Sequence, residues 1–185
     1  MTTDHRQGEQ RFSRGGWRRW VWLCFAAALL LRLLLLATTP ADAARPVEGE
    51  YQVHRVVDGD TLLLTSGVRV RLQGIDTPET VHPDKAVQPF GPEATDYTAS
   101  FVEQAAGRVT LTFGSERVDR YGRWLAFVWS GDHMLNEQLV EQGLARARLD
   151  YRYAGRMKRR LATAQADARQ QGRGIWSSAV TSAAF

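Results

Sequence analysis

Residues 51–73 read YQVHRVVDGDTLLLTSGVRVRLQ, a segment with three strand-like stretches in succession. The stretches are residues 51–57, 61–65 and 68–73. They are rich in β-branched and aliphatic side chains, and the first and last alternate apolar with polar positions. Asp58-Gly59 and Ser66-Gly67 separate them, and both dipeptides are typical of tight turns. The segment therefore predicts a meander of three antiparallel strands.

The rest of the chain adds two predicted strands, three predicted helices and a long loop. The strands are residues 109–113 and 124–129, the helices are 93–106, 135–142 and 156–171, and the loop is 75–92, with four prolines. Each helical pattern ends at a glycine, which is a common stop signal. Because strands and helices do not alternate regularly, a doubly wound sheet is disfavoured. We predict an α+β fold, a small five-stranded β-barrel of the OB type with about three packed α-helices.

Composition bounds the class of protein. The chain has 185 residues, 44% of them hydrophobic, and a single cysteine, Cys24. The apolar content excludes a fully disordered chain. The single cysteine excludes an intramolecular disulfide framework and a cysteine-rich zinc site. Residues 44–107 carry ten acids and five bases, whereas residues 108–185 carry seven acids and thirteen bases. Such polarised charge suits a site that holds a cation and an anion together.

The first 43 residues have the pattern of an export signal. Arginines precede an apolar run at residues 20–37, and Ala41-Asp42-Ala43 follows in the place of a cleavage site. Residues 1–43 are therefore predicted to be a signal peptide, with a retained inner-membrane anchor at 20–37 as the alternative, although Arg32 would be costly in a bilayer. The remaining divisions are a linker (44–50), the folded domain (51–178) and a tail (179–185).

Acidic and hydroxyl residues cluster in two short segments at the ends of the predicted strands of the meander. Asp60 precedes the strand 61–65, and Asp76, Thr77 and Glu79 follow the strand 68–73. Antiparallel neighbours can bring Asp60 and Asp76 to one end of the barrel. Carboxylate and backbone oxygens suit Ca²⁺ or Mg²⁺ rather than zinc. The alternative is structural, because Asp-Gly and Asp-Thr-Pro are also common turn sequences that need no metal.

Two arginines are placed to meet an anion beside these acids. Arg71 lies on the polar face of its strand, and Arg123 opens the strand 124–129 from a different side. Two guanidinium groups on one phosphate would give bidentate contacts and neutralise developing charge. Taken singly, each arginine is better explained as a solvated surface charge, and it is the combination with the neighbouring carboxylates that favours a shared site.

The last predicted helix is strongly basic. It contains Arg156, Lys158, Arg159, Arg160 and Arg169. These cations are consistent with a contact surface for a phosphate backbone or with a solvated helix face. The apolar spacing already explains the helix, which favours the solvated face.

Five segments of this chain together resemble the staphylococcal nuclease family. They are VDGDT (57–61), RLQGIDTPET (71–80), FGPEA (90–94), DRYGR (119–123) and GIWS (174–177). The resemblance runs from about Tyr51 to Trp176 in the family's order and does not cover the leader. It implies an OB-fold barrel and Ca²⁺-dependent hydrolysis of DNA and RNA to products with 3′-phosphates.

The resemblance also implies roles for particular residues. Asp60 and Asp76 resemble the carboxylate ligands of Ca²⁺, and Thr77 the residue that adds its backbone carbonyl. Glu79 resembles the glutamate that orients or deprotonates the attacking water. Arg71 and Arg123 resemble the pair that holds the scissile phosphate, where charge stabilisation is a safer role for a guanidinium than proton donation.

Substrate-binding positions follow from the same resemblance, with departures. The implied substrate-binding residues are Arg120, Tyr121 and Tyr151, of which Arg120 replaces a lysine. Base stacking on the two tyrosines would tolerate any sequence. Leu149 stands where the best-known member has a further nucleotide-contacting tyrosine, which affects substrate affinity rather than chemistry.

The sequence thus predicts an exported (periplasmic or secreted), Ca²⁺-dependent nuclease that acts on DNA and RNA, preferably single-stranded. No protein partner is indicated, a membrane is involved only if the leader is retained, and a monomer is the default. The alternative is a non-catalytic, membrane-tethered OB-fold module that binds nucleic acid, because a fold can be retained after its catalytic activity is lost. The intact set of ionisable residues favours the enzyme.

Overall fold

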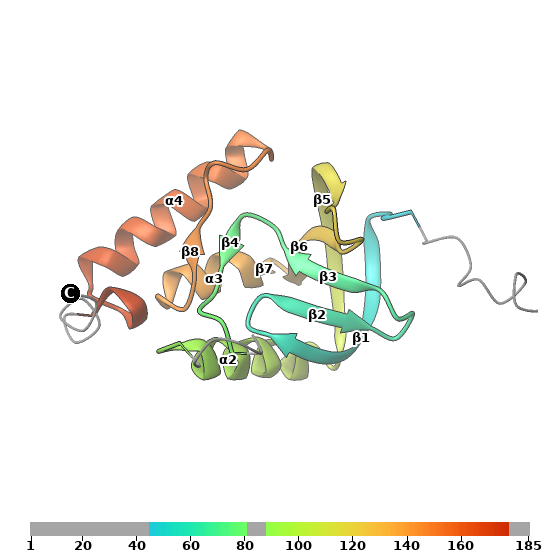
Figure 1. The fold of residues 1–185 in the computed structure, drawn as a ribbon, viewed down its shortest axis with the longest axis horizontal. Coiled ribbons are helices and arrows are strands. Elements are labelled where there is room, and N and C mark those ends of the chain that lie inside the picture. The colour runs from blue at the N-terminus through green and yellow to red at the C-terminus, as the bar shows by residue number, and fades with distance from the viewer. Residues whose placement is uncertain (1–44, 81–87, 178–185) are drawn as a thin grey trace, which may run out of the picture. The chain divides into compact units, whose positions relative to one another are not determined.

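A computed structural model describes residues 45–80 and 88–177. Within them, a closed barrel is formed by five strands: β1 (Gly49–Asp58), β2 (Thr61–Leu64), β3 (Arg69–Leu72), β5 (Arg108–Val118) and β6 (Trp124–Ser130). The strand order is β3-β2-β1-β5-β6, and a parallel pairing of β6 with β3 closes the sheet on itself (Figure 1). The predicted five-stranded barrel is confirmed. The leader, residues 81–87 and the tail lie outside the described residues.

Side chains alternate along each strand between the barrel interior and its outer surface. In β3, Val70 and Leu72 are almost fully buried, while Arg69 and Arg71 point to the other side. In β6, Ala126 and Val128 face the barrel interior in the same way. Burying the aliphatic residues therefore fixes Arg71 on the outer surface, at the end of β3.

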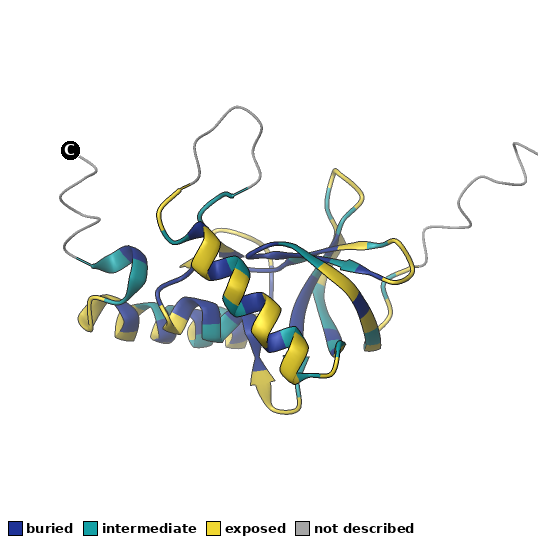
Figure 2. Ribbon diagram, turned by 90° about the horizontal axis from the view of Figure 1, so that it is seen from below, coloured by how far each residue is buried: buried dark blue, intermediate teal, exposed yellow. Residues whose placement is uncertain are grey.

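Three helices in the described residues pack around the barrel. They are α2 (Gly91–Gln104), α3 (Leu135–Glu141) and α4 (Gly155–Gln170), and a short 3-10 helix, η1 (Gly174–Trp176), follows. All three α-helices were predicted, with ends correct to within two residues. Helix α2 covers the β1 side of the barrel, and α4 packs on α3. Figure 2, seen from the α2 side, shows buried and exposed residues alternating along that helix, as its amphipathic spacing requires.

Short strands were not predicted. Strand β4 (Ile75–Asp76) pairs with β8 (Arg146–Ala147), and β7 (His133–Met134) pairs with β6. The prediction of a loop throughout 75–92 is therefore wrong at its first two residues, because a two-residue strand has no periodicity to detect. The β4–β8 pairing holds Asp76 beside Arg146. Strand β5 also continues to Val118, beyond the predicted end at residue 113.

A buried asparagine fixes the chain behind β3. Asn136, in α3, accepts a hydrogen bond from the Val128 amide (2.9 Å) and donates to the carbonyls of Gln73 (2.9 Å) and Ala126 (3.3 Å). These bonds join α3, β6 and the turn between β3 and β4. They hold the backbone at Gln73, between Arg71 and Asp76, against β6 and α3.

In the described ranges, 45–80 and 88–177, no helix is long and apolar enough to cross a bilayer. The apolar run at residues 20–37 lies outside those ranges.

Candidate active site

The turn between β1 and β2 is held by Asp58. Its Oδ1 accepts hydrogen bonds from the Gly59 amide (2.9 Å), Thr80 Oγ1 (2.6 Å) and Thr95 Oγ1 (3.4 Å). Gly59 is required for packing, because a Cβ there would lie 2.8 Å from the Ala94 Cβ of α2. The turn is thereby anchored to α2, and the direction of the next residue, Asp60, is set.

Asp60 is buried and surrounded by donors. Its Oδ1 accepts from Thr61 Oγ1 (3.0 Å), and its Oδ2 accepts from the Thr77 amide (3.1 Å) and Thr77 Oγ1 (3.0 Å). Burial raises the pKa of this carboxyl, and the Arg71 guanidinium and the hydrogen bonds from Thr77 and Thr61 offset that effect only in part. The surroundings of Asp60 therefore offset the cost of burying its charged form only in part.

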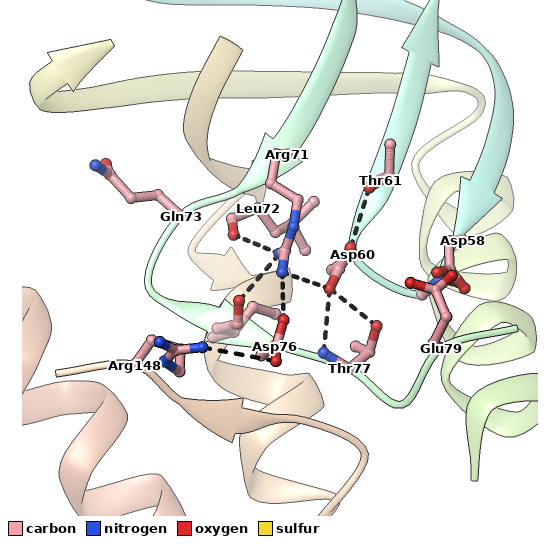
Figure 3. Close-up of polar contacts among 12 residues, drawn as sticks. Asp58, Asp60, Thr61, Arg71, Leu72, Gln73, Asp76, Thr77, Glu79 and Arg148 are labelled. Atoms are coloured by element: carbon pink, nitrogen blue, oxygen red, sulfur yellow. Dashed lines mark hydrogen bonds and ion pairs between the residues drawn. The ribbon is translucent and has the colours of Figure 1, made fainter. Parts of the chain in front are cut away.

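Arg71 joins the two carboxylates. Its Nη2 lies 2.9 Å from Asp60 Oδ2 and 2.7 Å from Asp76 Oδ1, as Figure 3 shows. Its Nη1 donates to the carbonyls of Leu72 (3.1 Å) and Ile75 (3.0 Å), which fixes the guanidinium plane. The structure thus brings Asp60, Asp76 and Arg71 together at one end of the barrel, with Thr77 beside them.

The donor set at this end fits a hard divalent cation. Asp60 and Asp76 offer carboxylate oxygens, Thr77 offers a backbone carbonyl, and a cation would offset the rest of the cost of burying the charged form of Asp60. Among the described residues, no cluster of three or more His, Cys, Asp or Glu side chains is present. The chain would therefore supply only part of a coordination shell, leaving positions for water and for a phosphate oxygen.

A second turn, between β5 and β6, lies across from Arg71 and Asp76 and lines the same cavity. Asp119 accepts from the backbone amides of Tyr121 (2.9 Å) and Arg123 (3.0 Å), and its Oδ2 pairs with Arg123 Nε at 2.7 Å. Gly122, with φ +79°, permits the tight turn. Arg120 lies over the Tyr121 ring at 4.8 Å and donates to its hydroxyl at 2.7 Å. Asp119 therefore orients Arg123, and Arg120 steadies Tyr121.

We expect Asp119→Asn to loosen Arg123 and to make stability depend less on pH. Burial alone would raise the pKa of Asp119, but the Arg123 side chain and the two amides outweigh it and lower the pKa. A lowered folded-state pKa gives stability that is present above about pH 4 and is lost as the pH falls through the folded value. Urea denaturation from pH 2 to 8 should show a stability loss in the variant that disappears at the acid end. A loss of the same size at every pH would contradict this.

Most of the predicted site residues surround one cavity of about 510 Å³. Six of the nine line it: Arg71, Asp76, Arg120, Tyr121, Arg123 and Tyr151. Asp60 and Thr77 lie next to it through their contacts with Arg71 and with each other. Glu79 does not line it, and Figure 3 shows its carboxylate near Asp58 instead.

Arg148 lies beside the site but was not singled out from the sequence. Its guanidinium binds Asp150 through two hydrogen bonds of 3.1 Å, lies 4.8 Å from the Tyr151 ring centre, and places Nη1 3.8 Å from Asp76 Oδ2. The β4–β8 pairing and the bond from the Arg148 amide to the Gly74 carbonyl (2.8 Å) bring it there, and nothing in the sequence signals that pairing. Leu149, where the family resemblance led us to look for a tyrosine, is partly exposed.

Comparison with known proteins identifies the family. A family model described as "Staphylococcal nuclease homologue" matches residues 69–178. The thermonuclease of Staphylococcus hyicus is 42% identical, over 70% of this chain and 77% of its own length. The thermonuclease of Staphylococcus intermedius is also 42% identical, over 70% of this chain and 78% of its own length. The SPbeta prophage-derived endonuclease YokF of Bacillus subtilis is 35% identical, over 69% of this chain and 44% of its own.

The barrel, the cavity and these matches define the class of protein, a nuclease that hydrolyses phosphodiester bonds. More particularly, the chain belongs to the staphylococcal nuclease family.

Proposed function

We propose that this nuclease is exported and Ca²⁺-dependent, and that it cleaves DNA and RNA, preferably single-stranded, to products with 3′-phosphates. The observation that carries the proposal is the joining of Asp60 and Asp76 by Arg71 at the edge of a cavity that Arg123 enters from the other wall. Two carboxylates and two guanidinium groups in one place suit the simultaneous binding of a cation and a phosphate.

The chain's own residues divide this work. Asp60, Asp76 and the Thr77 carbonyl would hold the Ca²⁺, which when bound would polarise the phosphate and position water. Arg71 and Arg123 would donate to phosphate oxygens and stabilise the negative charge that builds up as the nucleophile adds. Neither arginine needs to lose a proton for this.

Glu79 would orient or deprotonate the attacking water. Its backbone is held by Gln88, because its amide donates to Gln88 Oε1 (3.2 Å) and its carbonyl accepts from the Gln88 amide (3.0 Å). The carboxylate lies near Asp58 in Figure 3 and does not line the cavity, so this role requires the side chain to turn toward the cavity.

Tyr121 and Tyr151 would stack on bases at the two sides of the cavity. Both rings are exposed, and an arginine lies against each, Arg120 against Tyr121 and Arg148 against Tyr151. Stacking on flat rings tolerates any base and any sugar, in agreement with a substrate range that includes DNA and RNA. Such stacking also favours a single strand, because its bases are unpaired and can stack on the tyrosine rings.

Export rests on the leader sequence. We propose that residues 1–43 are removed after Ala43, with an anchor at 20–37 as the alternative, that 44–50 is a linker and 179–185 a tail, and that the domain at 51–178 acts as a monomer. Mass spectrometry of the protein from the extracellular or periplasmic fraction would show an N-terminus at Ala44 if the leader is cleaved.

The metal dependence and the product ends test the proposal together. The purified full chain in mild detergent is given single-stranded DNA with millimolar Ca²⁺, with Mg²⁺ or with chelator, and the product termini are determined. We expect cleavage with Ca²⁺ alone and 3′-phosphate ends. Binding that chelator leaves unchanged, with no cleavage in any condition, would instead establish the non-catalytic binding module.

A further inference from the structure

Helix α4 carries its cations where they do not help the helix. Arg156, Lys158, Arg159 and Arg160 lie in its first two turns, and its first turn contains no acid. The N-terminal end of a helix dipole is positive, so cations there are unfavourable. The buried residues Met157, Leu161, Ala164 and Ala168 already account for the packing of α4. Arg160 pairs with Glu137 and Lys158 donates to the Leu149 carbonyl, so the fold gives a structural reason for these two cations but none for Arg156 and Arg159.

Three of these four cations, all except Lys158, line a groove of about 390 Å³ between α4 and the barrel. Its lining residues are Thr112, Trp129, Arg156, Met157, Arg159 and Arg160. Arg160 is held by Glu137 through two hydrogen bonds and lies 5.2 Å from the Trp129 ring centre. Trp129 Nε1 donates to Thr112 Oγ1 at 2.9 Å. The floor of the groove is therefore fixed by internal contacts.

Two arginines at the groove remain available to a ligand. Arg156 and Arg159 are exposed, and within residues 45–80 and 88–177 neither forms an ion pair. An exposed guanidinium presents a planar set of donors that matches phosphate oxygens. The two side chains thus offer a pair of phosphate contacts beside a partly exposed aromatic ring.

The groove lies on the same outer face of β6 as the catalytic cavity. Leu125 lines the cavity and Trp129 lines the groove, and alternation places both on the outside of the strand. Four residues along a strand cover roughly 13 Å. Between them, Phe127 is covered by the Tyr153 ring at 5.7 Å, and Lys158 Nζ lies 5.3 Å from that ring. One cation, Lys158, which also donates to the Leu149 carbonyl, therefore lies between the cavity and the groove.

We propose that this groove is a second nucleic-acid contact site, which binds the phosphate backbone of a single-stranded substrate outside the cleavage cavity. The proposal rests on the proposed function, because the ligand is the far part of the same strand. Single-strand tracks on OB folds span about 4–16 nucleotides, and their affinity comes largely from cations along the backbone. The groove extends the track beyond the cavity, so long strands gain affinity that short ones do not.

The test compares two double variants of the full chain. Arg156→Ala with Arg159→Ala removes the two free cations of the groove. Arg55→Ala with Arg108→Ala removes two exposed cations from β1 and the start of β5 and serves as a control with the same change of charge. Binding of a fluorescent 20-nucleotide strand is measured in chelator by anisotropy at several salt concentrations. Cleavage of the 20-mer and of a trinucleotide is measured with Ca²⁺.

We expect the groove variant to bind the 20-mer about tenfold more weakly than the control variant. The slope of log K against log salt should fall by about 1.4, which corresponds to two lost phosphate contacts on a single strand. Cleavage of the trinucleotide should stay within about twofold of the original protein, because the cavity is unchanged. Thermal denaturation should show no loss of stability, since the removed cations oppose the helix dipole.

Equal affinity and salt slope in the two variants would overturn the proposal. An equal loss of cleavage on the trinucleotide would also overturn it. If a polyglutamate of the same charge bound as tightly as the 20-mer, the ligand would be an acidic protein and the proposal would be wrong. If the original protein cleaves no substrate under any condition while the binding results are as expected, the proposed function fails and the groove assignment stands.

Discussion

Glu79→Gln is expected to lower kcat by about 10²–10⁴-fold while leaving the affinity for a single strand close to that of the original protein. A positioned general base contributes about this much to a rate. Glutamine keeps the length of the side chain and the hydrogen bonds of the Glu79 backbone to Gln88. Single-turnover cleavage with saturating Ca²⁺ separates the chemical step from binding.

The pH dependence distinguishes the two roles of Glu79. If Glu79 removes the proton, the acid limb of the profile of kcat/KM against pH should disappear in the variant, whereas a residue that only orients water leaves the limb in place. Glu103→Gln, an exposed change at the far end of α2, is the matched control. Full activity in Glu79→Gln would remove Glu79 from the mechanism.

The barrel could be predicted because its signals are local. Strands β1, β2 and β3 follow one another in a meander, so period-two alternation and two glycine turns were enough. The same locality explains why Asp60, Arg71 and Asp76 could be placed together. They lie within 17 residues, on neighbouring strands and the turns that end them.

The rest of the site depends on contacts between distant segments. Arg148 reaches Asp76 through the pairing of β4 with β8 and its amide bond to the Gly74 carbonyl, and two-residue strands leave no pattern. Asp58 was predicted only as part of a turn, yet it accepts hydrogen bonds from Thr80 and Thr95, 22 and 37 residues away. The position of the Glu79 carboxylate depends on its side-chain torsions, which no sequence pattern reports.

The structure changes the weight of the two interpretations of the basic helix α4. From the sequence, the apolar spacing of α4 was sufficient reason for the helix, and its arginines were interpreted as a solvated face. The structure places Arg156 and Arg159 at the rim of a groove beside Trp129, on the same face of the barrel as the cavity. Because Thr112 and Trp129 come from β5 and β6, the groove could not be inferred from the helix alone.

Asp60→Asn is expected to have opposite effects on activity and on stability without metal. It removes one of the two carboxylates proposed to hold Ca²⁺, so cleavage should fall by at least about 10²-fold, as when an important electrostatic contact is lost. In chelator at pH 7 the variant should unfold at a higher temperature than the original protein. A gain of 1 kcal/mol corresponds to roughly 4 °C for a domain of this size.

The sign follows from the raised pKa of Asp60. Below about pH 4 the carboxyl is protonated in both the folded and the unfolded chain and has no effect. As the pH rises, the unfolded chain ionises first, so the original protein loses stability between the unfolded and the folded pKa. Asparagine cannot ionise, so the two melting temperatures should separate through this range and stay apart above it.

A neighbouring carboxylate provides the control. Asp58 is about as buried as Asp60. Within residues 45–80 and 88–177 its Oδ1 accepts three hydrogen bonds and no arginine pairs with it, so it acts in the turn rather than at the cavity. Asp58→Asn weakens charge-assisted hydrogen bonds and should lower the melting temperature in chelator. A lower melting temperature in Asp60→Asn as well would mean that its hydrogen bonds outweigh the cost of burying its charge.

Ca²⁺ should reverse the order of the two proteins. A ligand that binds only the folded state stabilises it by RT ln(1 + [L]/Kd), or about 2.7 kcal/mol at one hundred times Kd. The original protein should gain this stabilisation and Asp60→Asn should not, so the original becomes the more stable of the two in Ca²⁺. The reversal is measurable by calorimetry without any substrate. It would show that Asp60 lowers the stability of the metal-free barrel and recovers it only with a cation bound, as expected of a carboxylate kept for metal binding rather than for folding.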